Sequence, residues 1–230
     1  MTTEETIQIL RPFLTENRSE LFEKVINQRT RKLTVVLEDI YDPHNANAVI
    51  RSCDCFGIQD SHLIEVNSNF QVSRHVTTGS VKWLNVFRYR QFAAENRTKG
   101  TLDQLKSQGY KIVATTPHTQ NTPDQISFDK PIALVMGNES VGISKTVMEE
   151  ADELVQIPML GFTESFNLSV ATALFFQTFR AKLEKEYPGD YFLSQDEKNE
   201  ILLDWMKKTV KSSEAILGFH SGDNSAQVFA

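Results

Sequence analysis

Long apolar runs and cysteines are both scarce in this sequence. No apolar run approaches the roughly 18 residues that a membrane-spanning helix requires, and residues 1–10 are polar and acidic, without the apolar core of a secretory signal. We therefore expect a cytoplasmic protein with no membrane segment. The only two cysteines, Cys53 and Cys55, fall in an expected helix. Residues two apart on a helix do not face each other, so we expect no disulfide. We interpret both as small side chains that help to fill the core, in preference to a metal pair or a reactive thiol.

Several motifs of common enzyme classes are also absent. The five histidines do not have the spacing of metal ligands, so we expect no metal. No Gly-x-Gly-x-x-Gly follows a predicted strand, which excludes the dinucleotide-binding fingerprint. The phosphate-binding Walker loop and the Gly-x-Ser-x-Gly nucleophile elbow are missing as well. An ordinary nucleotide-binding α/β enzyme is therefore not indicated.

The chain has no overall excess of positive charge. Its formal net charge is −6 and its pI is about 5.4, which argues against indiscriminate nucleic-acid binding. The charges are uneven, however: residues 11–32 hold six basic and three acidic residues, and residues 82–111 hold seven and two. Lys207, Lys208 and Lys211 form a smaller group near the C-terminus. These stretches are either phosphate-binding surfaces or ordinary solvated ones, and composition alone favours the second interpretation.

The apolar pattern alternates between short strands and amphipathic helices. We expect helices over residues 3–14, 18–30, 45–56, 102–108, 144–150, 167–186 and 195–211, followed by a polar tail. We expect strands over residues 33–37, 62–66, 83–89, 110–115, 132–136 and 154–157. Asn45 is the expected N-cap of the third helix. This alternation predicts an α/β fold with a mostly parallel sheet, with a core over residues 32–186 and helical extensions over residues 1–31 and 187–230.

Three polar segments follow predicted strands, where open α/β sheets bind ligands. They are Asn-Ala-Asn-Ala-Val-Ile-Arg over residues 45–51, Val-Met-Gly-Asn-Glu-Ser-Val-Gly over residues 135–142, and Ile-Pro-Met-Leu-Gly-Phe-Thr-Glu-Ser-Phe-Asn-Leu-Ser over residues 157–169. The glycines of the second segment allow tight turns and close approach of a ligand. Each segment alone is weak evidence, because a Gly-Asn-Glu loop is usually a turn and the third segment also suits a helix cap.

Together and in this order, the three segments resemble the signature motifs of the SpoU/TrmH family of ribose 2′-O-methyltransferases, part of the knotted SPOUT superfamily. The matching stretches are residues 43–57, 132–144 and 157–171, and the resemblance covers about residues 18–186. The sequence departs from the family pattern at Phe166, where the family usually has leucine beside the cofactor. A larger ring at this position alters the adenosine pocket but keeps an apolar contact.

The resemblance implies a trefoil knot in the C-terminal part of the core. It also implies a homodimer, with the active site near its interface, and S-adenosyl-L-methionine as the cofactor. By position, the residues that line the cofactor pocket are Thr115, Gly137, Ile157, Met159 and Phe166.

The resemblance also implies which residues act in methyl transfer. Arg51 matches the family's catalytic arginine and Asn45 its positioning partner, while Glu139, Ser165 and Asn167 match further site residues. Because the cofactor carries the activated carbon, the protein has to orient the attacking hydroxyl and aid its deprotonation. Arginine keeps its proton at neutral pH. Arg51 therefore acts either as a base helped by an RNA phosphate or as a charged group that stabilises the alkoxide and binds a phosphate.

The flanking residues resemble the branch of the family that modifies guanosine 18 of tRNA. This likeness comes from Arg-Thr-Arg-Lys-Leu-Thr over residues 29–34, the Pro-His-Asn turn, Gly-Ser-Val-Lys-Trp over residues 79–83, and the short helical ends. We therefore expect tRNA as the substrate, with Arg29, Arg31 and Lys32 contacting its phosphates. The alternatives are an rRNA ribose methyltransferase and a non-catalytic RNA-binding protein of the same fold.

Overall fold

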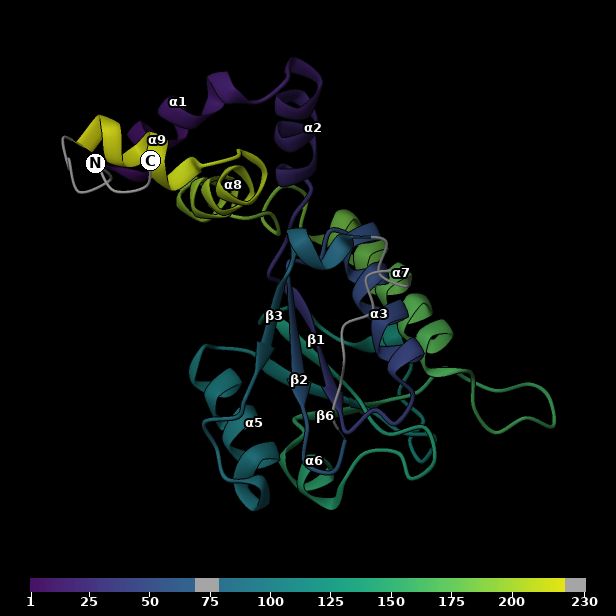
Figure 1. Ribbon diagram of the computed structural model, residues 1–230. Helices are drawn as coiled ribbons and strands as arrows, with labels where there is room; N and C mark the ends of the chain where they lie inside the picture. The colour runs from purple at the N-terminus through teal and green to yellow at the C-terminus, as the bar shows by residue number, and fades with distance from the viewer. Residues whose placement is uncertain (69–78, 222–230) are drawn as a thin grey trace. The chain divides into compact units, whose positions relative to one another are not determined.

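The computed structural model describes residues 1–68 and 79–221 (Figure 1). By its internal contacts the chain divides into two compact units, Thr30–Tyr191 and Met1–Arg29 with Phe192–Ala230. The division falls at residues 30 and 191, against the predicted boundaries at 32 and 186. The N-terminal and C-terminal segments thus belong to one unit instead of forming two separate extensions.

The larger unit is built on a parallel β-sheet. Within the described ranges the sheet has six strands in the order β3-β2-β1-β5-β4-β6, and every neighbouring pair is parallel. The strands are β1 Leu33–Glu38, β2 Asp60–Ile64, β3 Asn85–Arg88, β4 Lys111–Thr115, β5 Ile132–Met136 and β6 Glu153–Val155. The prediction of an α/β fold with a mostly parallel sheet is therefore confirmed.

The sheet is covered by helices on both faces. All residues of β1, β2 and β5 are buried, as expected for parallel strands covered on two sides. Figure 1 shows α3 and α7 side by side on one face and α5 and α6 on the other. The helices of this unit are α3 Pro43–Cys55, η2 Ser80–Trp83, η3 Ala94–Asn96, α5 Arg97–Ser107, η4 Pro123–Gln125, α6 Lys145–Glu150 and α7 Leu168–Glu186.

Two helix starts differ from the prediction. Helix α3 begins at Pro43, two residues earlier than predicted, and Asp42, not Asn45, is its N-cap, with its carboxylate accepting a hydrogen bond from the His44 amide. The fixed φ of proline suits the first position of a helix, so Pro43 begins this helix instead of breaking it. Helix α5 begins five residues before the predicted position, despite Gly100. A Cβ at Gly100 would lie 2.9 Å from the Phe92 ring, which explains glycine within this helix.

The smaller unit is helical. It contains α1 Thr3–Leu10, η1 Arg11–Phe13, α2 Glu16–Ile26, α8 Gln195–Thr209 and α9 Ser213–Ser221. Phe22 packs edge to face on Trp205, with ring centroids 5.5 Å apart. The prediction of a polar tail after residue 211 is wrong, because α9 brings the buried Leu217 to this core. The apolar residues of α9 cover too short a stretch to show the repeat of three to four residues that predicts a helix.

Neither cysteine is part of a disulfide in the structure. Cys53 is buried as expected, but Cys55 is exposed, because two residues correspond to about 200° of rotation on a helix. Among the described residues, no helix is both long and apolar enough to cross a membrane. In the same ranges, no group of three His, Cys, Asp or Glu side chains is placed to hold a metal ion.

Candidate active site

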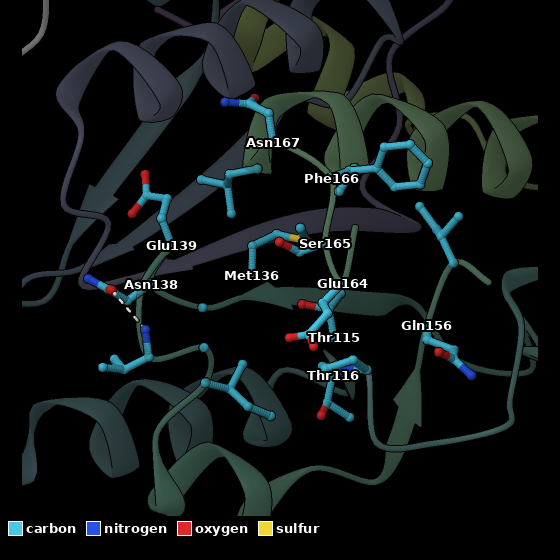
Figure 2. Close-up of a pocket in the computed structure, with 18 of the residues that line it drawn as sticks. Thr115, Thr116, Met136, Asn138, Glu139, Gln156, Glu164, Ser165, Phe166 and Asn167 are labelled. Atoms are coloured by element: carbon cyan, nitrogen blue, oxygen red, sulfur yellow. Dashed lines mark hydrogen bonds between the residues drawn. The ribbon is translucent and has the colours of Figure 1, made fainter. Parts of the chain in front are cut away.

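The polar segments meet at the carboxyl edge of the sheet. Leu37 pairs with Met136, and Ala114 pairs with Val135, so the loops that follow β1, β4 and β5 leave the sheet at one level. Between them and the start of α7 lies a cavity of about 680 Å³. All five residues predicted to hold the cofactor line it: Thr115, Gly137, Ile157, Met159 and Phe166. Figure 2 shows this cavity with Thr115 and Phe166 among its labelled side chains.

Gly137 lies at the start of a tight turn beside the cavity. The backbones of Asn138 and Gly142 exchange two hydrogen bonds, of 3.0 and 2.8 Å, which brings Gly142 and Ile143 back over Gly137. A Cβ at Gly137 would lie 2.3 Å from the Gly142 carbonyl carbon and 2.3 Å from the Ile143 nitrogen. The close approach of two backbone segments therefore requires glycine here.

Three predicted catalytic residues form one hydrogen-bonded chain. Asn45 Nδ2 donates to Glu139 Oε1 at 2.9 Å, and Asn167 Nδ2 donates to Asn45 Oδ1 at 3.0 Å. Each of the three residues comes from a different polar segment of the sequence. The Asn45 side chain is thereby fixed at both its amide nitrogen and its amide oxygen.

The ends of this chain are held by the backbone. The Glu139 carboxylate also accepts hydrogen bonds from the Tyr41 and Asp42 amides, at 2.9 and 3.4 Å. Asn167 is the N-cap of α7, and its Oδ1 accepts from the Ser169 and Val170 amides. Asn167 thus serves as a helix cap and as part of the site at once.

Because three donors converge on Glu139, we expect Glu139→Gln to lower the free energy of unfolding by about 1 kcal/mol. A glutamine amide has only one oxygen, so its NH2 group would face a backbone N–H. Urea titration of both proteins measures the difference. The matched control is Glu149→Gln on α6, whose partner is the exposed Lys145 in an i,i+4 pair, and there we expect a loss below about 0.5 kcal/mol. Equal losses in both variants would contradict a special role of the Glu139 hydrogen bonds.

Ser165 and Arg51 are placed differently from these three residues. Ser165 lines the cavity and is exposed. Arg51 is exposed on α3 and does not line the cavity. It lies six residues after Asn45, about 9 Å along the helix axis, and within residues 1–68 and 79–221 it has no hydrogen-bond or ion-pair partner. The Cα–Cβ bonds of a helix tilt toward its N-terminus, which is the end of α3 that carries Asn45.

Two residues that organise the site were not predicted. Asn138 donates from Nδ2 to the Asp39 carbonyl and accepts at Oδ1 from the Ser140 amide. Asp39 has a left-handed backbone, with φ of 49°, and its carboxylate accepts from the backbone amides of residues 66–68. Burial raises the pKa of Asp39, but these hydrogen bonds lower it more, so the net pKa lies below its usual value. Aspartate and asparagine at strand ends are the signal that sequence reasoning passed over.

The predicted phosphate contacts lie at the opposite edge of the sheet. Arg31 and Lys32 precede β1, about 20 Å from the site at the strand rise of 3.3 Å per residue. Arg29 is 1% exposed and lies over the Trp205 ring, so in this arrangement it is not available to a phosphate. Arg31 pairs with Asp60 at 2.9 Å. Of the three, Lys32 alone is partly exposed with no ion pair in the described part of the chain.

The basic excess over residues 82–111 is largely neutralised by the fold. Most of its cations pair with carboxylates from elsewhere: Arg88 and Arg90 with Glu65, Lys99 and Lys106 with Glu150, and Lys111 with Asp129 and Glu153. Counting charges along the sequence therefore overstated the positive charge of this stretch, because the compensating acids are distant in sequence.

Comparison with known proteins now decides the family. The model of the SpoU rRNA Methylase family matches residues 32–177. The chain belongs to the SpoU methylase family. This confirms the predicted family, and the matched region contains the cavity and the Glu139–Asn45–Asn167 chain.

Relatives of this SpoU family member include proteins named for tRNA and for rRNA. The tRNA (guanosine(18)-2'-O)-methyltransferase of Borreliella burgdorferi is 37% identical, over 91% of this chain and 94% of that protein. The crystal structure of the A. aeolicus TrmH/SpoU tRNA modifying enzyme matches with a TM-score of 0.75 and 28% identity, over 85% of this chain and 98% of that one. An AdoMet-bound rRNA methyltransferase from Sinorhizobium meliloti matches with a TM-score of 0.58 and 26% identity, over 69% of this chain and 59% of that one.

Proposed function

We propose that this SpoU family member transfers a methyl group from S-adenosyl-L-methionine to a ribose 2′-hydroxyl of tRNA, at guanosine 18 of the D-loop. The observation that carries the proposal is the hydrogen-bonded chain of Glu139, Asn45 and Asn167, which joins three separate motifs beside one cavity. The Borreliella burgdorferi relative is named for this reaction, and the match spans 94% of that protein. This similarity supports tRNA as the substrate.

The cavity suits the cofactor in size and chemistry. Its volume of about 680 Å³ lies within the range of about 300–1,000 Å³ that ligand pockets have. Met136 and Ile157 offer apolar surface for a purine, and the backbone of residues 137–142 offers polar groups. We assign Thr115, Gly137, Ile157, Met159 and Phe166 to holding the cofactor, which when bound supplies a methyl group activated on a sulfonium sulfur.

The protein's own task is to orient and activate the ribose hydroxyl. Asn45, fixed by its two side-chain neighbours, is the positioning residue, and the exposed Ser165 hydroxyl offers a further hydrogen bond at the cavity. We assign to Arg51 the role of a charged group that stabilises the developing alkoxide and binds a neighbouring phosphate. Arginine is always protonated at neutral pH, and no carboxylate of the described chain competes for Arg51.

Of the two alternatives, one has specific support. The Sinorhizobium meliloti structure is named for rRNA, which favours an rRNA substrate as the second candidate. A non-catalytic RNA-binding protein of this fold is the third. The intact set of Asn45, Arg51, Glu139, Ser165 and Asn167 argues against it, because a binding protein has no need of this constellation.

One assay separates these candidates. The purified protein is incubated with methyl-labelled cofactor and either total tRNA or rRNA, and the label is mapped to a nucleotide. We expect label in tRNA at guanosine 18, and none in a tRNA that carries 2′-deoxyguanosine there. Label in rRNA alone would support the second candidate, and label in neither RNA would support the third.

The RNA surface of the larger unit is proposed to include Lys32. Each phosphate contact contributes about 0.7–0.9 to the slope of log affinity against log salt. We therefore expect Lys32→Gln to reduce the slope of tRNA binding by about this amount. Arg29→Gln should instead lower stability without changing the slope, because Arg29 is buried. Filter binding at several salt concentrations, together with urea titration, measures both. Equal slopes for Lys32→Gln and the parent would mean that Lys32 is merely solvated.

We also propose a homodimer, a trefoil knot and cytoplasmic action. Val170 and Leu174 are 47% and 41% exposed, and their i,i+4 spacing places them on one face of α7, which suits a subunit interface. For the knot, the support is the path after β6. That strand lies at the edge of the sheet, yet the next helix, α7, packs on α3, so residues 156–167 return across the carboxyl edge. For the location, the support is the proposed tRNA substrate, which is found in the cytoplasm.

A further inference from the structure

One carboxylate in the cavity has no role in the proposed chemistry. Glu164 lies between β6 and α7, and Figure 2 shows its side chain pointing into the cavity. The side chain is exposed and makes no hydrogen bond or ion pair with any residue that the structure describes. Its charge is therefore available to a molecule that enters the cavity.

The other charged groups of the cavity do not offset Glu164. Glu139 is the second carboxylate, and it is engaged by Asn45 and by two backbone amides. Among the described residues that line the cavity, His118 alone has a basic side chain, and no lysine or arginine is present. A cavity lined in this way favours a cation over a neutral molecule of the same shape.

We propose that Glu164 makes the cavity select the cationic cofactor over its neutral-sulfur product. This inference rests on the proposed function. The cofactor and its demethylated product share the adenosine and amino-acid groups, so apolar contacts bind both alike. They differ in one methyl group and one positive charge, because the sulfonium becomes a thioether. Charge is thus the main property by which a fixed pocket can tell them apart, and Glu164 is the specificity-determining residue.

The test is a calorimetric titration of three ligands at low salt. They are S-adenosylmethionine, S-adenosylhomocysteine and sinefungin, a cofactor analogue with a protonated amine in place of the sulfonium methyl. We expect Glu164→Gln to weaken binding of the two cationic ligands by about tenfold, or about 1.4 kcal/mol, and binding of S-adenosylhomocysteine by less than about twofold. At higher salt concentration, the substitution should weaken the cationic ligands by a smaller factor, because salt screens an exposed charge.

Two further variants control for fold and for net charge. Glu164→Asp keeps the carboxylate and should keep most of the discrimination. Glu95→Gln changes the net charge equally, at an exposed η3 residue with no partner among the described residues, and should bind all three ligands as the parent does. Thermal unfolding of each variant confirms that it is folded before titration.

Each remaining outcome overturns the proposal. Equal weakening of all three ligands by Glu164→Gln would mean that Glu164 holds a group they share, such as the α-ammonium. Unchanged binding would mean that Glu164 is only solvated. If the parent methylates RNA and either of these results is found, the inference fails and the proposed function stands. If the parent binds none of the three ligands, both fail together.

Discussion

Replacing Arg51 with alanine is expected to lower the turnover of RNA methylation at least about tenfold while leaving cofactor affinity unchanged. Arg51 is exposed on α3, outside the cavity lining, and has no partner in the described ranges. Its removal should therefore neither unfold the protein nor disturb the cavity. The loss arises because a charge that stabilises the alkoxide acts mainly in the transition state.

Single-turnover kinetics with saturating cofactor, and calorimetry of cofactor binding, test this prediction. The matched control is Lys185→Ala, which removes an exposed cation from the last turn of α7. We expect the control to methylate at the parental rate. An Arg51→Ala protein that also did so would not have lost a catalytic residue. A tenfold loss of cofactor affinity would instead assign Arg51 to the pocket.

The second large effect is expected from Gly137→Ala. The new Cβ would lie 2.3 Å from two backbone atoms, and backbone cannot move aside as a flexible side chain does. We expect a loss of about 3 kcal/mol in the free energy of unfolding, and cofactor affinity lowered at least about tenfold because the displaced loop lines the cavity. Urea titration and calorimetry measure the two losses.

Gly161→Ala is the control for this substitution. Gly161 lies in the segment before α7, its φ is not in the left-handed region, and nothing lies within 4 Å of a Cβ built there. We expect both quantities to stay near the parental values. If Gly137→Ala behaved like Gly161→Ala, the loop would be able to rearrange around the methyl group, and the tight turn would not be required for binding.

The fold was largely predictable because the strands β1, β2 and β5 are completely buried. A continuous apolar run such as residues 132–136 predicts a buried strand, and β5 has these bounds. Helix starts were harder, because capping depends on one hydrogen bond: Asp42 and Asn45 are both good N-caps, and the proline at position 43 decided in favour of Asp42. The membership of α1 and α8 in one unit was not predictable, because no local pattern records which distant helices pack together.

The residues of the candidate site were predicted mainly from their resemblance to the family's motifs, and less from the physical chemistry of the sequence. Likeness indicated Asn45, Glu139 and Asn167, and the structure brings these three together. It did not reveal that Arg29 is buried, because a basic residue among other basic residues looks solvated in sequence. Glu164 was assigned no role from the sequence, since only the structure shows that its side chain points into the cavity.

The division of the smaller unit between the two ends of the chain bears on how the protein folds. Helices α1 and α2 pack on α8, and α1 also packs on α9, so the contacts of the smaller unit span more than 160 residues of intervening chain. Closing so long a loop is entropically costly, and during synthesis α8 emerges after the whole of the larger unit. The larger unit can thus fold first, from contacts within one continuous segment. The helices made first are then among the last to bury their apolar faces, and until then Ile7 and Leu10 stay open to other molecules, including chaperones.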